Sequence, residues 1–285
     1  MKGIFCQSDL YITSINEIGM LLSKDEAICL VLGLSQNKKI TTITKLNKLL
    51  ARLNLFLIPI DIDFRLNKFG SFNSELGELN TNELYEIQRY TINNSEHKSC
   101  KLKENGEYVF NKVKKRMQEI FTDEEFTELK KEINFLSQLS ASDLSEKEHE
   151  ILLVDKDERF KLEQRLNDNY ISLMDLYDEI DKIKEDSIIS IKLKALIEYC
   201  YYLMKYLKER RFKSIPEEYE FDAFMFDYYF LAILQKYIIP FLVKQITEKD
   251  INTVKINRYY QYIVNYPKGR YPFSIDNENL NQIIQ

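Results

Sequence analysis

Basic side chains gather on two stretches of the first half of the chain, where they could contact nucleic-acid phosphates. The candidates are Lys45, Lys48, Arg52, Lys98, Lys101 and Lys103. The first three are three and four residues apart, so one face of a helix would carry them. Lysine and arginine neutralise phosphates and release the counterions bound there. This pattern predicts a site that grips a nucleic-acid backbone.

Base recognition would need polar side chains beside these cations. Asn73, Asn80 and Asn82 are the nearby residues whose amides could pair with base edges. The intervening segment, however, carries four glutamates and no lysine or arginine between residues 74 and 87. Two other interpretations therefore stay open: the lysines form an ordinary solvated face, or the acidic segment docks a basic protein surface.

Catalytic and metal-binding patterns are weak. Asp61 and Asp63 would share one face of a strand and could hold a cation, but no third carboxylate follows at a telling spacing. His97 and His149 fit neither a zinc-protease pattern nor a catalytic triad, and the seven glycines form no phosphate-binding loop. We expect no enzyme activity, no metal and no cofactor.

Composition favours a mostly α protein in a reducing cytoplasm. Only 7 glycines and 5 prolines occur in 285 residues, and the four cysteines lie far apart.

The start of the chain lacks a signal-peptide pattern. The apolar stretch 223–243 contains Asp227, Lys236 and Pro240, so we expect a helix buried in protein rather than a membrane span. Residues 1–118 carry 17 basic and 13 acidic side chains, whereas the rest carry 23 and 32.

The elements that would position the cations follow a recognisable order. After a lead segment over residues 1–22, Ser23 and Glu26 predict a capping box for a buried helix that ends near Gly33. A second helix begins near Thr44, a strand or extended connection spans 55–64, and residues 68–70 turn the chain. Ser74 would cap a third helix reaching about residue 87. Strands over 88–91 and 98–102 would form a hairpin wing, followed by a closing helix over 107–120.

From residue 122 onward the apolar period is helical. One seam of a long helix consists of Leu162, Leu166, Tyr170, Leu173, Tyr177 and Ile180. Further helices are expected over 188–212 and 221–246, so the second half should be a helical bundle. The basic cluster 208–213 is most simply the cationic end of a helix, and the Tyr-rich tail after residue 255 is expected to be an ordered extension.

Several motifs in the first half of the chain resemble those of a known protein family. They are Thr44–Lys45–Leu46–Asn47–Lys48–Leu49–Leu50, the segment 68–76, and Lys103–Glu104–Asn105–Gly106. These three stretches resemble motifs of the YwgA-like prokaryotic winged-helix family. That family shows a T-K-L-x-K-L-L helix, a Y-G-P-[YF]-S-x-E-L segment and an L-T-x-x-G entry into its last helix. Here Ser71 replaces the proline, Asn73 is an extra residue and Glu104 replaces the threonine. The resemblance covers about residues 20–118 and implies a winged helix linked to DNA.

Together these patterns predict a winged helix-turn-helix domain with a small β wing at residues 1–120, followed by a helical bundle at 121–285. We expect a DNA-binding regulator of transcription that grips duplex phosphates through Lys45, Lys48, Arg52, Lys98, Lys101 and Lys103, with Asn73 near the bases, and that forms a homodimer through its bundle. The alternative is an interaction protein whose winged helix docks a protein partner and never touches DNA.

Overall fold

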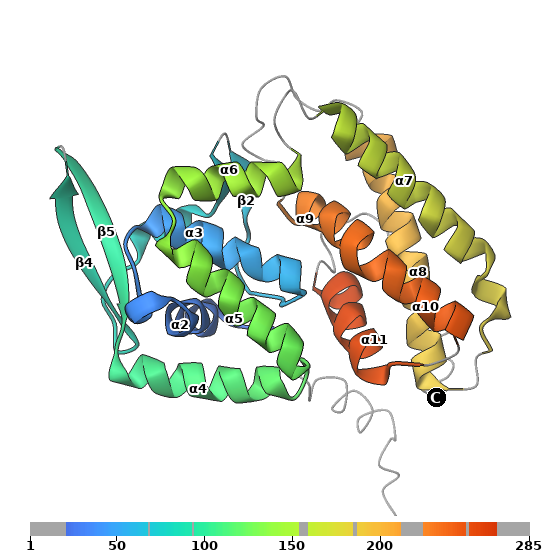
Figure 1. Ribbon diagram of the computed structural model, residues 1–285, viewed down its shortest axis with the longest axis horizontal. Coiled ribbons are helices and arrows are strands. Elements are labelled where there is room, and N and C mark those ends of the chain that lie inside the picture. Colours follow the sequence, from blue (N-terminus) through green and yellow to red (C-terminus); the bar gives the residue numbers. More distant parts are fainter. Residues whose placement is uncertain are drawn as a thin grey trace, which may run out of the picture.

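The chain folds into a mostly helical protein with a small antiparallel sheet at one side, as composition predicted. This computed structural model describes residues 21–67, 69–92, 94–153, 159–184, 187–211, 225–248 and 251–266. In Figure 1 the early helices and the sheet lie on the left, and the late helices lie on the right. The hydrophobic core runs continuously through both groups.

Two early helices begin with side-chain caps, of which the sequence predicts the one at Ser23. Helix α2 (Lys24–Leu34) begins with a full capping box between Ser23 and Glu26, and seven of its residues are buried. Helix α3 (Ile43–Arg52) begins one residue earlier than expected, because the Thr42 side chain accepts a hydrogen bond from the backbone NH of Lys45. Later helices cover both α2 and α3, and as a result the cationic side chains of α3 are buried.

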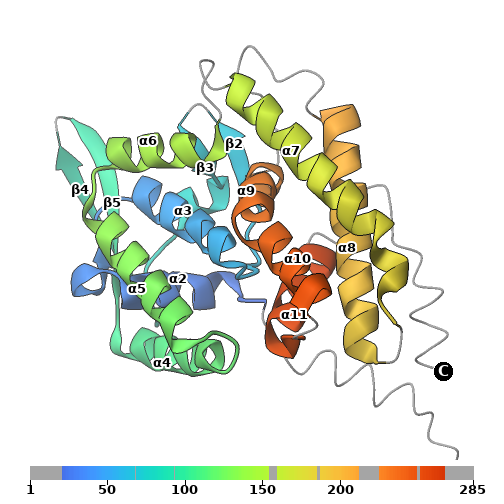
Figure 2. The same cartoon turned by 45° about the vertical axis from the view of Figure 1, so that its right-hand side comes forward.

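The sheet contains three antiparallel strands in the order β1–β5–β4. Strand β1 (Lys39–Ile40) is short, whereas β4 (Tyr85–Ile92) and β5 (Ser95–Leu102) form a long hairpin that projects beyond the helices in Figures 1 and 2. Tyr85 pairs with Leu102 at its base and Ile92 with Ser95 at its tip. The predicted hairpin is confirmed, and its strands are longer than the predicted ranges 88–91 and 98–102.

The predicted third helix over residues 74–87 is wrong. Only a short 3-10 helix, η3 (Ser74–Glu78), forms there, and Asn73 rather than Ser74 caps it. Asn82 then accepts hydrogen bonds from the backbone NH groups of Leu84 and Tyr85, which turns the chain directly into β4. Asparagine side chains compete for backbone donors in this way and so end helices.

Of the two alternatives predicted for residues 55–64, the strand is wrong, whereas a connection without regular secondary structure is found over residues 58–64. A 3-10 helix, η2 (Leu53–Phe56), continues from α3, and Leu57 then adopts a left-handed conformation with φ of 56°. After Leu57, one isolated parallel β-bridge pairs Ile60 with Leu22. A second, unpredicted hairpin of β2 (Arg65–Asn67) and β3 (Gly70–Phe72) surrounds the expected turn at 68–70.

Three helices complete the left half in Figure 1. Helix α4 (Glu104–Gln118) begins three residues before the predicted start, α5 spans Asp123–Gln138, and α6 spans Ala141–Leu152. Helix α5 packs against α2 and α3, and α6 packs against α3 and β3. The packing therefore continues across residue 120, the predicted domain boundary.

The remaining helices form the predicted helical second half. Helix α7 (Arg159–Asp178) packs along α8 (Ile188–Tyr206), with Leu162, Leu166 and Leu173 of the predicted seam buried. The short η5 (Ile180–Lys182) follows α7, and the π-helical turn η6 (Leu207–Arg211) extends α8. Helices α11 (Thr253–Tyr260) and η8 (Gln261–Asn265) pack against α8.

One continuous helical stretch crosses the centre of the right half: α9 (Met225–Ile233), the π-helical turn η7 (Leu234–Ile238) and α10 (Ile239–Glu248). Within the described residues, Phe226–Thr247 alone is long and apolar enough to cross a membrane, and 56% of its most apolar window is buried inside the protein. Tyr229, Phe230 and Leu231 of this stretch are fully enclosed by protein.

Some expectations fall outside the described residues. These are the lead segment before residue 21, Cys6, residues 212 and 213 of the basic cluster, the first residues of the helix expected over 221–246, and the tail beyond residue 266.

Candidate nucleic-acid interface and a buried ionic network

The three cations of α3 lie inside the protein, which corrects the prediction that they form an exposed stripe. Lys45, Lys48 and Arg52 are exposed by only 6%, 4% and 6%. Helices α5 and α6 and strand β3 pack on the face that these side chains occupy. The spacing correctly grouped them on α3, but that face is covered by later parts of the chain. They cannot reach a phosphate in this conformation.

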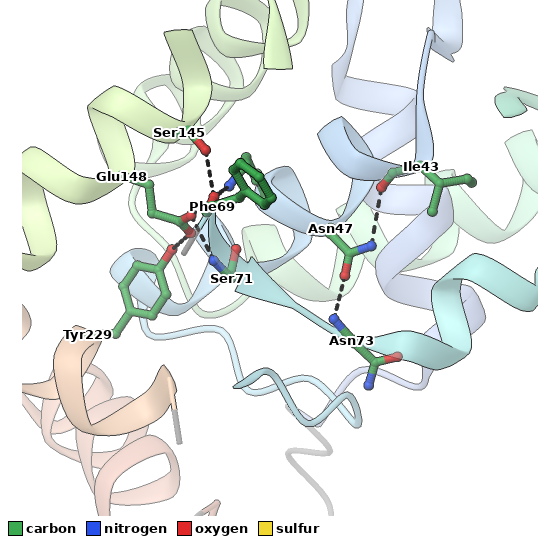
Figure 3. Close-up of polar contacts among 9 residues, drawn as sticks. Ile43, Asn47, Phe69, Ser71, Asn73, Ser145, Glu148 and Tyr229 are labelled. Atoms are coloured by element: carbon green, nitrogen blue, oxygen red, sulfur yellow. Dashed lines mark hydrogen bonds and ion pairs between the residues drawn. The ribbon is translucent and has the colours of Figure 1, made fainter. Parts of the chain in front are cut away.

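Lys48 belongs to a buried ionic network. Its Nζ lies 3.1 Å from Glu148 Oε2, and both side chains are at most 4% exposed. Lys48 also donates a hydrogen bond to the carbonyl oxygen of Phe69. Glu148 Oε2 accepts a second hydrogen bond from the backbone NH of Ser71 at 2.9 Å. Figure 3 shows Glu148 of α6 facing Ser71 and Tyr229.

Tyr229 completes the network from the opposite half of the sequence. Its hydroxyl donates a 2.7 Å hydrogen bond to Glu148 Oε1. Burial and the nearby Glu148 carboxylate raise the pKa of Tyr229, so the hydroxyl keeps the proton that it donates. A buried charge is tolerated when a partner and hydrogen bonds surround it, and Glu148 has all of these. The network therefore connects α3, β3, α6 and α9.

Gly70 allows this close approach. Its φ is +95°, which L side chains rarely adopt, and a Cβ there would lie 1.9 Å from Glu148 Oε2 and 2.8 Å from Lys48 Nζ. On the adjoining residue, the Phe69 carbonyl also accepts a 2.5 Å hydrogen bond from the Ser145 hydroxyl. Phe69 and Gly70 are thus held by α3 and α6 together.

Asn73 has a structural role, which corrects its prediction as a base reader. Its backbone NH donates to Asn47 Oδ1 at 2.7 Å, and its side-chain Nδ2 donates to the Asp63 carbonyl at 2.8 Å. Its Oδ1 caps η3. Figure 3 shows Asn47 lying between Ile43 and Asn73. The amide is therefore occupied by the backbone around it.

Other polar pairs connect segments that are far apart in the sequence. Arg52 pairs with Glu132 of α5 at 3.1 Å. The buried Tyr262 hydroxyl donates to Asn54 Oδ1 at 2.8 Å. Arg258 donates two hydrogen bonds to Glu125, at 2.9 and 3.1 Å. Burial alone would raise the pKa of Glu125, but the Arg258 hydrogen bonds and charge outweigh it and lower that pKa to about 2.

The lysines of β5 and the residue that follows it, Lys103, lie at or near the protein surface. Lys101 and Lys103 are exposed and Lys98 is half-buried. Lys98 donates to the Gly77 carbonyl at 2.6 Å and Lys103 donates to the Asn82 carbonyl at 2.7 Å. Both cations thus brace the loop before β4 while their charges stay at the surface.

One side of the sheet gathers polar and aromatic groups from strands β1, β4 and β5. We call it the hairpin face, and it consists of Lys39, Glu86, Gln88, Tyr90, His97 and Lys101, with Glu86 opposite Lys101. Cross-strand pairing places Tyr90 opposite His97 and Lys39 opposite Lys101. The Tyr90 and His97 rings stack with centroids 5.6 Å apart. Lys39 donates to Gln88 Oε1 at 3.3 Å.

Part of the hairpin face could have been predicted from the sequence. The period of two over 85–92 and 95–102 would have grouped its strand residues, had the strands been assigned their full length. Glu148 and Tyr229 had no such signal, because 100 and 181 residues separate them from Lys48 along the chain and no local period relates them.

Metal and thiol chemistry find little support in the part of the chain that the structure describes. No group of three or more metal-ligating side chains occurs there, and Asp61 and Asp63 are both exposed. Cys29, Cys100 and Cys200 are buried free thiols. Burial raises the pKa of Cys29 and of Cys100 to about 12, so these thiols are poor nucleophiles.

Comparison with known proteins returned no match to any family model, to any curated protein or to any solved structure.

Proposed function

We propose that this chain is a non-enzymatic DNA-binding protein of the winged-helix type, which holds duplex phosphates with its projecting hairpin. The observation that carries the proposal is the β4–β5 hairpin, with Lys98, Lys101 and Lys103 at its surface and Lys39 beside them. A hairpin with cations on both faces can lie along a phosphate backbone.

The order of the elements supports the winged-helix part of this proposal. Helix α2, strand β1 and helix α3 precede the hairpin, β1 pairs with β5 at the sheet edge, and α4 follows directly. The resemblance of residues 20–118 to the YwgA-like family points the same way. The segment where a recognition helix would stand holds only η3, a single short turn.

That short turn shapes the predicted kind of DNA binding. A helix must be several turns long to present side chains along the major groove, and η3 spans five residues with Glu75 and Glu78 exposed. Contacts from the hairpin to phosphates carry little sequence information. We therefore expect sequence-tolerant binding, in which the stacked Tyr90–His97 pair adds contact area rather than base selection.

A second function, docking of a protein partner, is favoured by the same acidic turn. Glu75 and Glu78 would repel a phosphate backbone but would attract a basic protein surface. In this alternative the buried α3 cations are purely structural, and the hairpin lysines are an ordinary solvated face.

Homodimerisation through the helical half is part of the main proposal. Three large apolar side chains of α7 are exposed: Phe160 at 75%, Ile171 at 52% and Met174 at 37%. Their spacing places them on one face of the helix. Exposed apolar side chains gathered on one helix face are typical of helix–helix contacts between subunits. Light scattering tests this, since a constant monomer mass at all concentrations would contradict it.

Fluorescence anisotropy with a labelled random duplex tests DNA binding directly. The protein is titrated at low and at physiological salt, and the proposal expects binding that weakens steeply as salt rises. A duplex with a different sequence should bind within a few-fold of the first. Absence of binding even at low salt would reject the DNA proposal and favour the protein-docking alternative.

A further inference from the structure

A groove lies among the early helices. It has a volume of about 370 Å³ and runs between the end of α2, one face of α4 and one face of α5. Figures 1 and 2 show these three helices side by side. The volume is within the range of small-molecule sites, near its lower end.

The floor of the groove is apolar and is shaped by a glycine. Leu34, Phe110 and Phe126 line it. Gly33 lies directly under the Phe110 ring, where a Cβ would come within 2.3 Å of a ring carbon. Any larger residue at position 33 would push this ring outward, so the depth of the groove depends on the glycine.

The rim of the groove carries two lysines. Lys114 of α4 is half-buried and Lys130 of α5 is exposed, and both line the groove. Within the described residues neither has an ion-pair partner, whereas nearby Lys38 pairs with Glu107 at 2.7 Å and Arg116 pairs with Glu26 at 3.2 Å. Two unpaired cations above an apolar floor attract an anion that also has an apolar body.

The other polar groups of the rim are compatible with such a ligand. Gln118 and Thr127 can donate hydrogen bonds to an anionic group. The one carboxylate among the lining residues, Asp123, lies in the first turn of α5, where the positive end of the helix offsets its charge.

We propose that this groove binds a small amphipathic anion, a molecule with a carboxylate, sulfonate or similar group on an apolar body. The apolar body lies on Leu34, Phe110 and Phe126, and the anionic group lies between Lys114 and Lys130. This inference is independent of DNA binding, because none of these residues belongs to the hairpin. It gives the chain a ligand site that the proposed function does not require.

The probe for the test is 8-anilinonaphthalene-1-sulfonate, an aromatic anion whose fluorescence rises on transfer to an apolar site. Titration of the full chain should show saturable binding with one site per chain. The variant with Lys114→Glu and Lys130→Glu should bind at least about tenfold more weakly, because it replaces two attractions with two repulsions. The matched control carries Lys112→Glu and Lys115→Glu, two exposed lysines of α4 outside the groove, and should keep the wild-type affinity.

A second pair of variants separates groove filling from charge. Thr127→Trp places an indole in the groove from an exposed position and should abolish binding, whereas Glu128→Trp, one residue further on and also exposed, should not. Far-ultraviolet circular dichroism and thermal melts check that all four variants keep the native fold. The proposal is overturned if the wild type binds no probe, if the groove variants bind like their controls, or if both control variants lose binding as well.

Discussion

Lys48 Nζ lies 3.1 Å from Glu148 Oε2, and the pair is almost wholly enclosed at the point where α3, β3, α6 and α9 meet. A buried ion pair is weak support for stability by itself, because removing two charges from water offsets much of their attraction. Its loss on one side only is costly, since the remaining charge stays buried without a partner. This asymmetry gives the first prediction.

Lys48→Met should lower the free energy of unfolding by about 3–5 kcal/mol, because it leaves the Glu148 carboxylate without its cation. Lys48→Met combined with Glu148→Gln should be less damaging than the sum of the two single changes. Urea denaturation of the four proteins of this double-mutant cycle measures the coupling. Additive effects would show that the two residues contribute independently.

Gly70→Ala should destabilise the fold by about 2 kcal/mol or more, because it adds a side chain at a positive φ and within van der Waals overlap of Glu148. Gly77→Ala is the matched control, since nothing lies within 4 Å of its added Cβ. Thermal melts of both variants give the comparison. Equal melting temperatures would refute the close approach at Gly70.

The free energy of unfolding should fall at low pH because of Glu125. Its pKa is lowered from 4.5 to about 2 despite burial, so its pairing with Arg258 stabilises the fold above pH 4.5 and is lost as the pH falls toward 2. Glu125→Gln should therefore cost roughly 2 kcal/mol at pH 7 and progressively less below pH 4.5. Denaturation midpoints at pH 7, 4 and 2.5 test this, with the exposed Glu128→Gln as control. A cost that stays constant over this range would contradict the prediction.

Hairpin lysines should determine the salt dependence of any DNA binding. Replacing Lys98, Lys101 and Lys103 by alanine should reduce the slope of log affinity against log salt by about 0.9 for each phosphate that the variant no longer neutralises. Replacing the exposed lysines Lys112, Lys131 and Lys184 should leave the slope unchanged. Replacing Lys45 and Lys48 should destabilise the protein without a specific change in slope, because both lie inside.

Buried cysteines should resist alkylation in the native protein. Burial raises the pKa of Cys29 and of Cys100 to about 12, so their thiolate fraction at pH 8 is small and their sulfurs are also shielded. Site-resolved mass spectrometry after iodoacetamide treatment should find Cys29, Cys100 and Cys200 labelled only after denaturation. Rapid labelling of any of them in the native state would show that the core around it opens.

The sequence by itself determined those helices and strands that depend on residues close together in the chain. The capping box at Ser23 and Glu26, the apolar period of α7 and the hairpin over 88–102 each depend on residues a few positions apart, and the sequence predicts all three. The helix over 74–87 failed for an equally local reason: Asn82 takes the backbone donors of Leu84 and Tyr85 and starts a strand.

Only the tertiary structure decided which side of each element meets water. The cationic face of α3 looked solvated because nothing near it in sequence indicates that α5 and α6 cover it. The partner of Lys48 is 100 residues away, and Tyr229 joins from still further along the chain. Helical period states which residues share a face, but burial depends on packing between distant segments, which no local pattern encodes.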